Sequence, residues 1–236
     1  MLRVVITEYP KSGGSWVVSM LGDTLGICKR DIYVKDGYDL FDIWKHPWYE
    51  GANDLGLTKS CVIKSHEFPK SSLITFPAHF VHLVRDGRDL VISKYFYEKY
   101  FCVANGIYEK FEVPFDDYLK EIASEWKEYI KVWLEHIQYF YRYEDFLLDP
   151  FSMIQKLLMS LNISFSEEKI WYAVQNNTKQ KFKKSLDKVF RYNTFVRRGT
   201  RGDWRNHFSD EHIRAFKEIA GDILILLGYE KDLDWQ

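Results

Sequence analysis

The sequence predicts an α/β fold, a single domain with a central parallel β-sheet flanked by helices. Two stretches carry this prediction: the β-branched run 4–6 and the apolar run 79–84 each precede a polar turn and then an amphipathic segment. Strand, turn and helix in this order are typical of parallel sheets, whose strands are joined by crossover helices. A third apolar run, 61–63, also ends in polar residues, so we expect three strand ends at one edge of the sheet.

Length and composition are those of a soluble globular protein. The chain has 236 residues, which is long enough to bury a full core, and we expect one domain over residues 1–236. Apolar residues make up 46% and charged residues 28%. Aromatic residues, at 17%, are unusually frequent, and we expect some of them to line a pocket for a flat or apolar ligand.

Charge and cysteine content exclude several classes of protein. The net charge of −1 gives no global attraction to nucleic acid or to an acidic membrane. Cys28, Cys61 and Cys102 are scattered, which argues against a disulfide framework or a zinc site and fits a reducing compartment. The chain shows no leader segment and no apolar run of membrane-spanning length, so we expect a cytoplasmic location.

The loop after the first strand has the composition of an anion site. Residues 10–16 have the sequence Pro-Lys-Ser-Gly-Gly-Ser-Trp, and a helical pattern follows to Gly26. Glycines let backbone N–H groups turn inward, the lysine adds a charge, and the helix start adds unpaired donors. In the nucleotide loop G-x-x-x-x-G-K-[ST] the lysine follows the glycines, whereas here it precedes them. The residues expected at the anion are Lys11, Ser12, Gly13, Gly14, Ser15 and Trp16.

This residue order resembles the 5′-phosphosulfate loop of the sulfotransferase family, whose usual form is Pro-Lys-Ser-Gly-Thr-Thr-Trp. The resemblance implies a P-loop-like phosphosulfate-binding loop. It also implies 3′-phosphoadenylyl sulfate (PAPS) as donor and adenosine 3′,5′-bisphosphate (PAP) as product, without a metal.

The run 61–66 places Lys64, Ser65 and His66 after a short strand, at the rim where ligands bind in parallel sheets. Family members that act on small hydroxyl compounds carry a similar Lys-Thr-His, and the resemblance implies that His66 is the general base. Histidine suits this role because its ordinary pKa lies near neutral pH. Lys64 is expected to steady the transferring group or to orient the strand end.

The segment that begins at Arg85 resembles the family's 3′-phosphate motif, Arg-x-x-Arg-Asp-x-x-x-Ser. The resemblance places Arg85 and Ser93 on the phosphate. Asp86 or Asp89 is expected to cap the following helix. Gly87 stands where the family commonly has proline, and we expect this change to preserve the turn.

Two later segments complete the resemblance. Residues 143–145 are similar to a Tyr-Glu-Asp segment whose tyrosine touches the nucleotide, which places Tyr143 beside adenine with Trp16. Its two carboxylates are expected to serve the turn and helix capping. The run 197–205 is similar to Arg-Lys-Gly-x-x-Gly-Asp-Trp-Lys, and its cationic start suits a phosphate. The residues implied there are Arg197, Arg198 and Gly199.

Other segments complete the expected fold. Residues 33–60 form a long aromatic loop, either a wall of the acceptor pocket or a satellite hydrophobic cluster, and the irregular segment 97–115 could form a lid. One polar residue of 176–179, Asn177 or Thr178, is implied at adenine. Helices are expected over 115–136, 151–161 and 210–228, and a strand over 139–143.

These motifs occur in the family's order over nearly the whole chain, which predicts a sulfotransferase acting on a small-molecule hydroxyl or amine acceptor. His66 would act as base, and Lys11 would stabilise the group in transfer. A kinase of the P-loop type and a non-catalytic PAP or PAPS sensor are the alternatives. The chain lacks the family's dimer-forming pattern at 205–214, so we expect a monomer or a dimer that does not use this segment.

Overall fold

A wholly parallel five-stranded sheet, in the order β2-β3-β1-β4-β5, organises the fold. The computed structural model describes residues 1–31, 59–70, 74–75, 77–137, 139–187 and 198–236. The strands are β1 (Arg3–Glu8), β2 (Cys28–Asp31), β3 (Cys61–Ser65), β4 (His79–Val84) and β5 (Phe140–Arg142). The predicted α/β fold with a parallel sheet is therefore confirmed.

The two faces of the sheet bury different side chains. Val4 and Ile6 of β1 belong to one hydrophobic core, whereas Val5 belongs to the other. This alternation follows from the two-residue period of a strand. Because β1 has a parallel strand on each side and is buried on both faces, its central residues 4–6 are continuously apolar.

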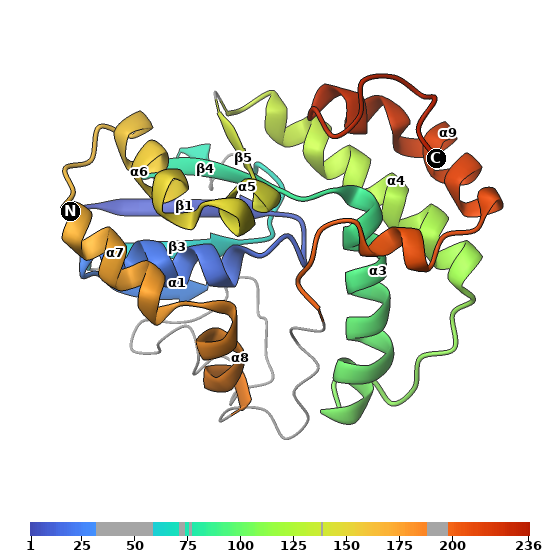
Figure 1. Cartoon of the computed structure of the whole chain (residues 1–236), viewed down its shortest axis with the longest axis horizontal. Helices are drawn as coiled ribbons and strands as arrows, with labels where there is room; N and C mark the ends of the chain where they lie inside the picture. The colour runs from blue at the N-terminus through green and yellow to red at the C-terminus, as the bar shows by residue number, and fades with distance from the viewer. Residues whose placement is uncertain (32–58, 71–73, 76, 138, 188–197) are drawn as a thin grey trace.

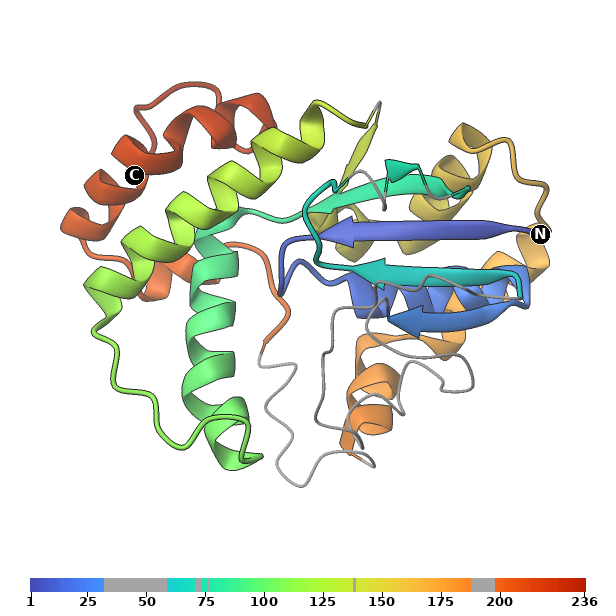
Figure 2. The ribbon, with the colours of Figure 1, turned by 180° about the vertical axis from the view of Figure 1, so that it is seen from behind.

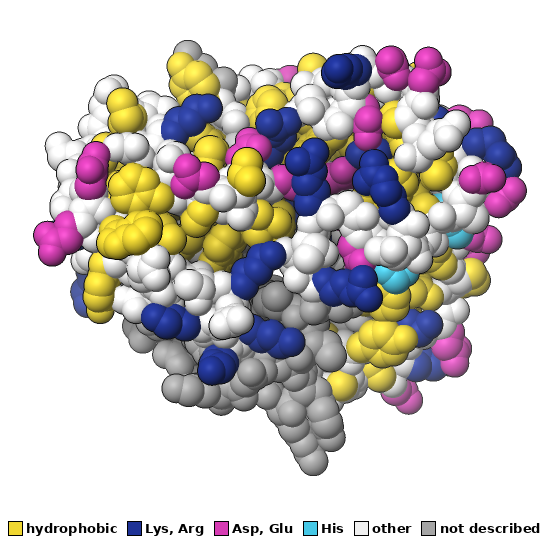
Figure 3. All heavy atoms as spheres, in the orientation of Figure 1, with side chains coloured by type: hydrophobic (Ala, Val, Ile, Leu, Met, Phe, Trp, Pro, Cys, Tyr) yellow, Lys and Arg dark blue, Asp and Glu magenta, His cyan; other side chains and the backbone are white. Residues whose placement is uncertain are grey.

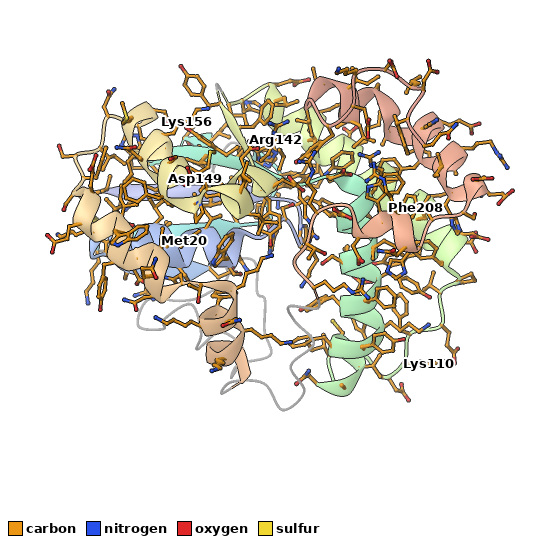
Figure 4. All side chains as sticks on the ribbon, viewed as in Figure 1. Met20, Lys110, Arg142, Asp149, Lys156 and Phe208 are labelled. Atoms are coloured by element: carbon orange, nitrogen blue, oxygen red, sulfur yellow. The ribbon has the colours of Figure 1, made fainter. Side chains whose placement is uncertain are left out.

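One face is covered by α1 (Gly14–Leu25), α6 (Pro150–Ser160) and α7 (Glu167–Asn176). Figure 1 shows these helices in front of the sheet, and Figure 4 labels Met20, a fully buried residue of α1. Helix α1 ends at Gly26, whose φ of 65° lies in the left-handed region that favours glycine. This helix, which follows the loop predicted to bind an anion, packs against the sheet through its buried residues.

A second group of helices lies beyond the carboxyl ends of the strands (Figure 2). It consists of α3 (Gly87–Phe96), α4 (Phe115–Leu134) and α9 (Asp210–Leu226). Trp126 and Trp133 of α4 are fully buried in the second core. Phe208, labelled in Figure 4, packs against Trp204 and Phe216. The carboxyl ends of the strands thus face this second group of helices.

Local periodicity predicted most of these elements. The strands over 4–6, 61–63, 79–84 and 139–143 and the helices over 16–26, 115–136, 151–161 and 210–228 are confirmed within a few residues at their ends. The prediction for 97–115 was wrong in part, because Tyr97–Cys102 continues α3 as a π-helical segment, η2. The elements missed were β2, α5 (Tyr143–Leu148) and α7, which are short or polar in composition. The aromatic loop over 33–60 lies almost wholly outside the described residues.

Arg88 joins the turn after β4 to the C-terminal part of the chain. Its guanidinium lies 2.7 Å from Asp86 and 2.6 Å from Glu230, and it is 2% exposed. The rings of Trp204 and Trp235 lie 4.3 and 4.4 Å from the guanidinium carbon. The second arginine of the Arg-x-x-Arg motif is therefore structural, and it fixes the backbone on which Arg85 stands.

Gly87 is confined by aromatic side chains. A Cβ at this position would lie 2.6 Å from Trp126 and 2.9 Å from Phe216. We therefore expect Gly87→Ala to reduce the free energy of unfolding by about 1–3 kcal/mol, the usual cost of overpacking. Denaturant unfolding would measure it, with Gly221→Ala as control because the close contact of that Cβ is with the end of the Leu233 side chain, at 2.6 Å. An unchanged denaturation midpoint for Gly87→Ala would show that the Trp126 and Phe216 side chains move to make room for the Cβ.

Candidate active site

A cavity of about 600 Å³ opens at the carboxyl ends of β1, β3 and β4. In parallel sheets this edge is the usual place for ligands. Its walls include the loop after β1, the end of β3, the β4–α3 region, and parts of α5 and α8 (Lys179–Asp187). The predicted site residues that line it are Lys11, Gly13, Gly14, Ser15, Trp16, Lys64, His66, Arg85, Ser93, Tyr143, Arg198 and Gly199.

The loop after β1 has the tight turn that its glycines predicted. Gly13 has a φ of 98° and Lys11 a φ of 77°, both in the left-handed region. The loop is closed internally by Ser12, whose hydroxyl donates to the carbonyl oxygen of Tyr9 at 2.8 Å. Ser12 therefore shapes the loop, and its side chain is almost fully buried.

Lys11 lies inside the cavity with its ammonium 3.9 Å from the centroid of the Tyr97 ring. Burial, assisted by the nearby positive charge of Arg85, lowers the pKa of Lys11 to about 7. A negatively charged ligand would oppose both effects and favour the protonated form. Binding of an anion would therefore shift Lys11 toward its charged form.

His66 is oriented by the backbone of the neighbouring strand. Its Nδ1 lies 3.0 Å from the carbonyl oxygen of Glu8, so Nδ1 carries the proton and donates it to this bond. The other ring nitrogen, Nε2, then holds a lone pair. Burial first, and Lys64 second, lower the pKa of His66 to about 4. The imidazole is therefore neutral near pH 7 and can accept a proton at Nε2.

Lys64 is held from two sides. Its ammonium lies 2.8 Å from Asp31 of β2 and donates to the hydroxyl of Ser15 at 3.4 Å. Its pKa is raised despite burial, because Asp31 and Glu8 are close. Lys64 remains charged, and it ties the end of β3 to the start of α1.

Arg85 and Ser93 both line the cavity. Nη1 of Arg85 donates to the carbonyl oxygen of Lys11 at 2.9 Å, and the guanidinium carbon lies 5.2 Å from the centroid of the Tyr143 ring. Nε of Arg85 is buried and has no hydrogen-bond partner among the described residues. A buried guanidinium that retains an unused donor beside a cavity fits a phosphate oxygen.

Two aromatic rings form the wall beside the loop. Trp16 and Tyr143 meet edge to face with centroids 6.0 Å apart, and a Cβ on Gly13 would lie 2.4 Å from the Tyr143 ring. The indole N–H of Trp16 donates to the carbonyl oxygen of Asn177 at 2.5 Å. The Asn177 amide donates to Asp23 at 2.7 Å and is directed away, while Lys179 of the same segment lines the cavity.

The last motif is brought to the cavity by Asp89. This buried carboxylate accepts the backbone N–H groups of Gly202 at 2.6 Å and Trp204 at 2.9 Å, at the start of η3 (Asp203–Asn206). Asp86, in contrast, caps α3 by accepting the N–H of Arg88 at 3.0 Å. The two carboxylates considered for the cap therefore have separate functions.

Arg198 and Gly199 stand at the cavity mouth. The Arg198 guanidinium lies 2.8 Å from Asp203, and the carbonyl oxygen of Gly199 accepts a hydrogen bond from Lys179. Arg197 lies outside the described residues. Figure 3 shows further basic side chains on this face of the molecule, beside the residues that the structure does not describe.

A model of the sulfotransferase domain matches residues 2–228. The chain belongs to the sulfotransferase family. Sulfotransferase 1C2 of Homo sapiens is 25% identical, over 92% of this chain and 81% of that protein. Sulfotransferase 1A1 of Mus musculus is 29% identical, over 90% and 82% of the two chains. The predicted enzyme class is thus confirmed.

Solved structures share the fold of this sulfotransferase. A mouse sulfotransferase complexed with PAP superposes with a TM-score of 0.70 at 19% identity, over 94% of this chain and 84% of that chain. Retinol dehydratase, in complex with androsterone and inactive cofactor PAP, gives 0.67 at 19% identity, over 99% and 82%. Both likenesses concern the fold.

Sequence reasoning missed the roles of several residues in this sulfotransferase, of which Tyr97, Tyr108 and Glu8 line the cavity and Glu144 does not. Glu144 serves neither cap nor turn, because its carboxylate accepts the N–H of Asp86 at 3.1 Å and the hydroxyl of Tyr229 at 2.8 Å. Its partners are distant in sequence, and no local signal points to them. Tyr97 and Tyr108 line the cavity from the segment proposed as a lid. Glu8 also lines it, and its place at the end of β1 was a signal that could have been used.

The described residues contain no group of three or more His, Cys, Asp or Glu side chains that could hold a metal ion. Among their helices, none is both long and apolar enough to cross a membrane.

Proposed function

We propose that this sulfotransferase transfers a sulfuryl group from PAPS to the hydroxyl or amine group of a small molecule and releases PAP. The observation that carries the proposal is the orientation of His66, whose Nδ1 is held by the Glu8 carbonyl while the ring lines the same cavity as Lys11 and Arg85. A proton acceptor, a phosphate loop and a buried guanidinium share one space. Acceptor activation and donor binding can therefore occur together.

The donor would lie between the loop and the β4–α3 turn. The residues suited to its 5′-phosphosulfate are Lys11, Ser12, Gly13, Gly14 and Ser15, and those suited to its 3′-phosphate are Arg85, Ser93, Arg197, Arg198 and Gly199. The aromatic pair Trp16 and Tyr143 would border the adenine. When bound, the donor supplies the sulfuryl group and the bisphosphate that leaves.

His66 would prepare the acceptor. Its Nε2 takes the proton from the acceptor hydroxyl as the oxygen attacks, and the positive charge that develops on the ring is stabilised through Nδ1 and the Glu8 carbonyl. The Glu8 carboxyl group lies 3.9 Å from Nδ1 and, in its charged form, favours the same positive charge.

Lys11 would stabilise the negative charge that grows on the oxygen between sulfur and phosphorus, as positioned cations do in phosphoryl transfer. Lys64 is more constrained, because its ammonium is already paired with Asp31. We propose that Lys64 fixes the distance between His66 and the loop through Ser15 and adds charge to the cavity. Lys11 is then the principal cation of transfer.

Two alternatives differ in testable ways. A kinase would transfer phosphate from ATP and require Mg²⁺. A PAP sensor would need no proton acceptor, and the fixed orientation of His66 disfavours it.

The decisive assay supplies PAPS with a panel of phenols, alcohols, amines and sugars and measures sulfated product in EDTA. We expect sulfate transfer to at least one acceptor, undiminished by EDTA, and no phosphate transfer from ATP with Mg²⁺. The matched control is the His66→Ala protein. Donor binding without any turnover over a broad panel would favour the sensor, and an EDTA-sensitive reaction with ATP would favour the kinase.

Donor capture should weaken as the pH rises through about 7. In the free protein Lys11 has a pKa of about 7, lowered by burial, so the ammonium that attracts the donor is lost above this pH. We expect kcat/KM for PAPS to fall by up to about tenfold per pH unit beyond it. Bound donor favours the ammonium, so the alkaline limb of kcat should lie at higher pH. Superimposable limbs for the two profiles would contradict this role of Lys11.

A further inference from the structure

Glu8, the last residue of β1, is a buried carboxylate in the wall of the cavity. It is 2% exposed. Its carboxylate accepts the backbone N–H of Gly14 at 2.5 Å, and Gly14 is the first residue of α1. This N–H is one of the unpaired donors with which a helix start binds anions. A side chain of the protein therefore already holds part of the anion site.

Gly14 and Glu8 are sterically matched. A Cβ on Gly14 would lie 2.4 Å from the carboxyl carbon of Glu8 and 2.5 and 2.8 Å from its two oxygens. Any side chain at position 14 would thus displace the carboxylate. The family's usual loop has threonine at this position, where the present chain has glycine. The Glu8 carboxylate fills the volume that such a side chain would take.

Glu8 stands among charged groups from three elements. Lys64 and His66 face it from the end of β3, Lys11 from the loop, and Asp31 from β2. Burial raises the pKa of Glu8 to about 7, although the two lysines and the Gly14 N–H oppose this shift. Near neutral pH the carboxyl group therefore exchanges between its neutral and charged forms. A dianionic phosphate bound nearby would favour the neutral form.

We propose that Glu8 is a positioning residue for the donor: its carboxyl group fixes the Gly14 amide and the start of α1 in place of a side chain at position 14, and its negative charge opposes donor binding. The inference rests on the proposed function, because the ligand is the PAPS or PAP of that site. It makes donor affinity depend on Glu8 and Gly14 as a pair, so that a larger side chain at position 14 is tolerated only when Glu8 is also replaced.

The first test exchanges the pair. PAP affinity is measured by calorimetry at pH 6 for Gly14→Thr, Glu8→Thr and the double variant. We expect Gly14→Thr to weaken binding by at least about tenfold, since overpacking against Glu8 disturbs the loop. The double variant should return to within about threefold of wild type, because the two changes are coupled. Gly22→Ala is the control, since its Cβ would meet Lys29 at 2.4 Å at the far end of the same helix.

The second test separates charge from shape. Glu8→Gln keeps an oxygen for the Gly14 N–H and cannot ionise, while Glu8→Ala loses both. We expect Glu8→Gln to bind PAP as wild type does at pH 6 and about threefold tighter than wild type at pH 8, where the wild-type carboxylate is charged. Loss of that charge also lowers the pKa of Lys11, which limits the gain. Glu8→Ala should bind more weakly at both pH values, and Asp149→Asn, a remote helix cap, should match wild type.

The outcomes are distinct. Additive effects of the two threonine substitutions, or a ratio between Glu8→Gln and wild type that is the same at pH 6 and 8, would show that Glu8 is only structural. A folded wild-type protein that fails to bind PAP would instead refute the donor assignment, and the inference with it. Melting temperatures verify that each variant is folded. Should Gly14→Thr fail to fold, the pH comparison alone decides.

Discussion

Replacing His66 with alanine is expected to lower turnover by about 10²–10⁴-fold, the usual contribution of a positioned base. The affinity for PAP should change by less than about threefold, because the groups proposed to bind its phosphates belong to the loop, the β4–α3 turn and the Arg198 segment. The reason is geometric, since the Glu8 carbonyl holds Nδ1 and so sets the orientation of the ring in the cavity. Steady-state turnover and PAP calorimetry on the same preparation separate the two quantities.

The matched control for this substitution is His79→Ala. His79 is exposed at the start of β4, at the opposite end of the strand from the cavity, and should be dispensable. Turnover of His66→Ala within a few-fold of wild type would show that His66 is structural. The role of general base would then fall to Lys64, to a carboxylate such as Glu67, or to water. A parallel loss of PAP binding would indicate damage to the loop.

The second large effect concerns Arg85. We expect wild type to bind PAP at least about tenfold more tightly than AMP, because each charged hydrogen bond to the 3′-phosphate contributes about 1.5–3 kcal/mol. Arg85→Ala should remove most of this preference and leave AMP affinity less affected. The unused Nε donor of Arg85 and its bond to the Lys11 carbonyl are the physical basis.

Arg214→Ala serves as the control for loss of a guanidinium, because this exposed residue pairs only with Glu211 among the described contacts. Its PAP and AMP affinities should equal those of wild type. Equal affinity of wild type for PAP and AMP would remove the 3′-phosphate assignment. If Arg85→Ala still prefers PAP to AMP, the 3′-phosphate contact would be assigned to Ser93 or to the Arg197–Gly199 segment instead.

Features encoded within a few residues were predictable. The loop 10–16, the polar end of β3 and the turn that begins at Arg85 each combine a strand with its following residues, and the edge where they meet follows from parallel topology. The resemblance of these segments to known motifs added their chemical assignments. The structure brings Lys11, His66 and Arg85 into one cavity, as this reasoning required.

Features that depend on distant partners were not predictable. β2 is a short edge strand of mixed polarity, and pairing with β3 is what makes it a strand. The roles of Glu144 and Arg88 depend on Tyr229, Glu230 and Trp235, more than eighty residues away in sequence. The link between Glu8 and Gly14 is close in sequence. No sequence pattern predicts it, because it depends on the Glu8 side chain accepting the N–H of Gly14 in the loop that follows.

The enclosure of Arg88 has a consequence for biosynthesis. Translation delivers the loop after β1 and His66 early, but the guanidinium of Arg88 meets Glu230 and Trp235 only after the ribosome has synthesised both. A nascent or prematurely terminated chain would carry the proposed base and donor loop, while its Arg88 lacked Glu230 and Trp235. We expect such chains to be captured by chaperones or proteases, so that partial polypeptides do not accumulate and sequester the sulfate donor.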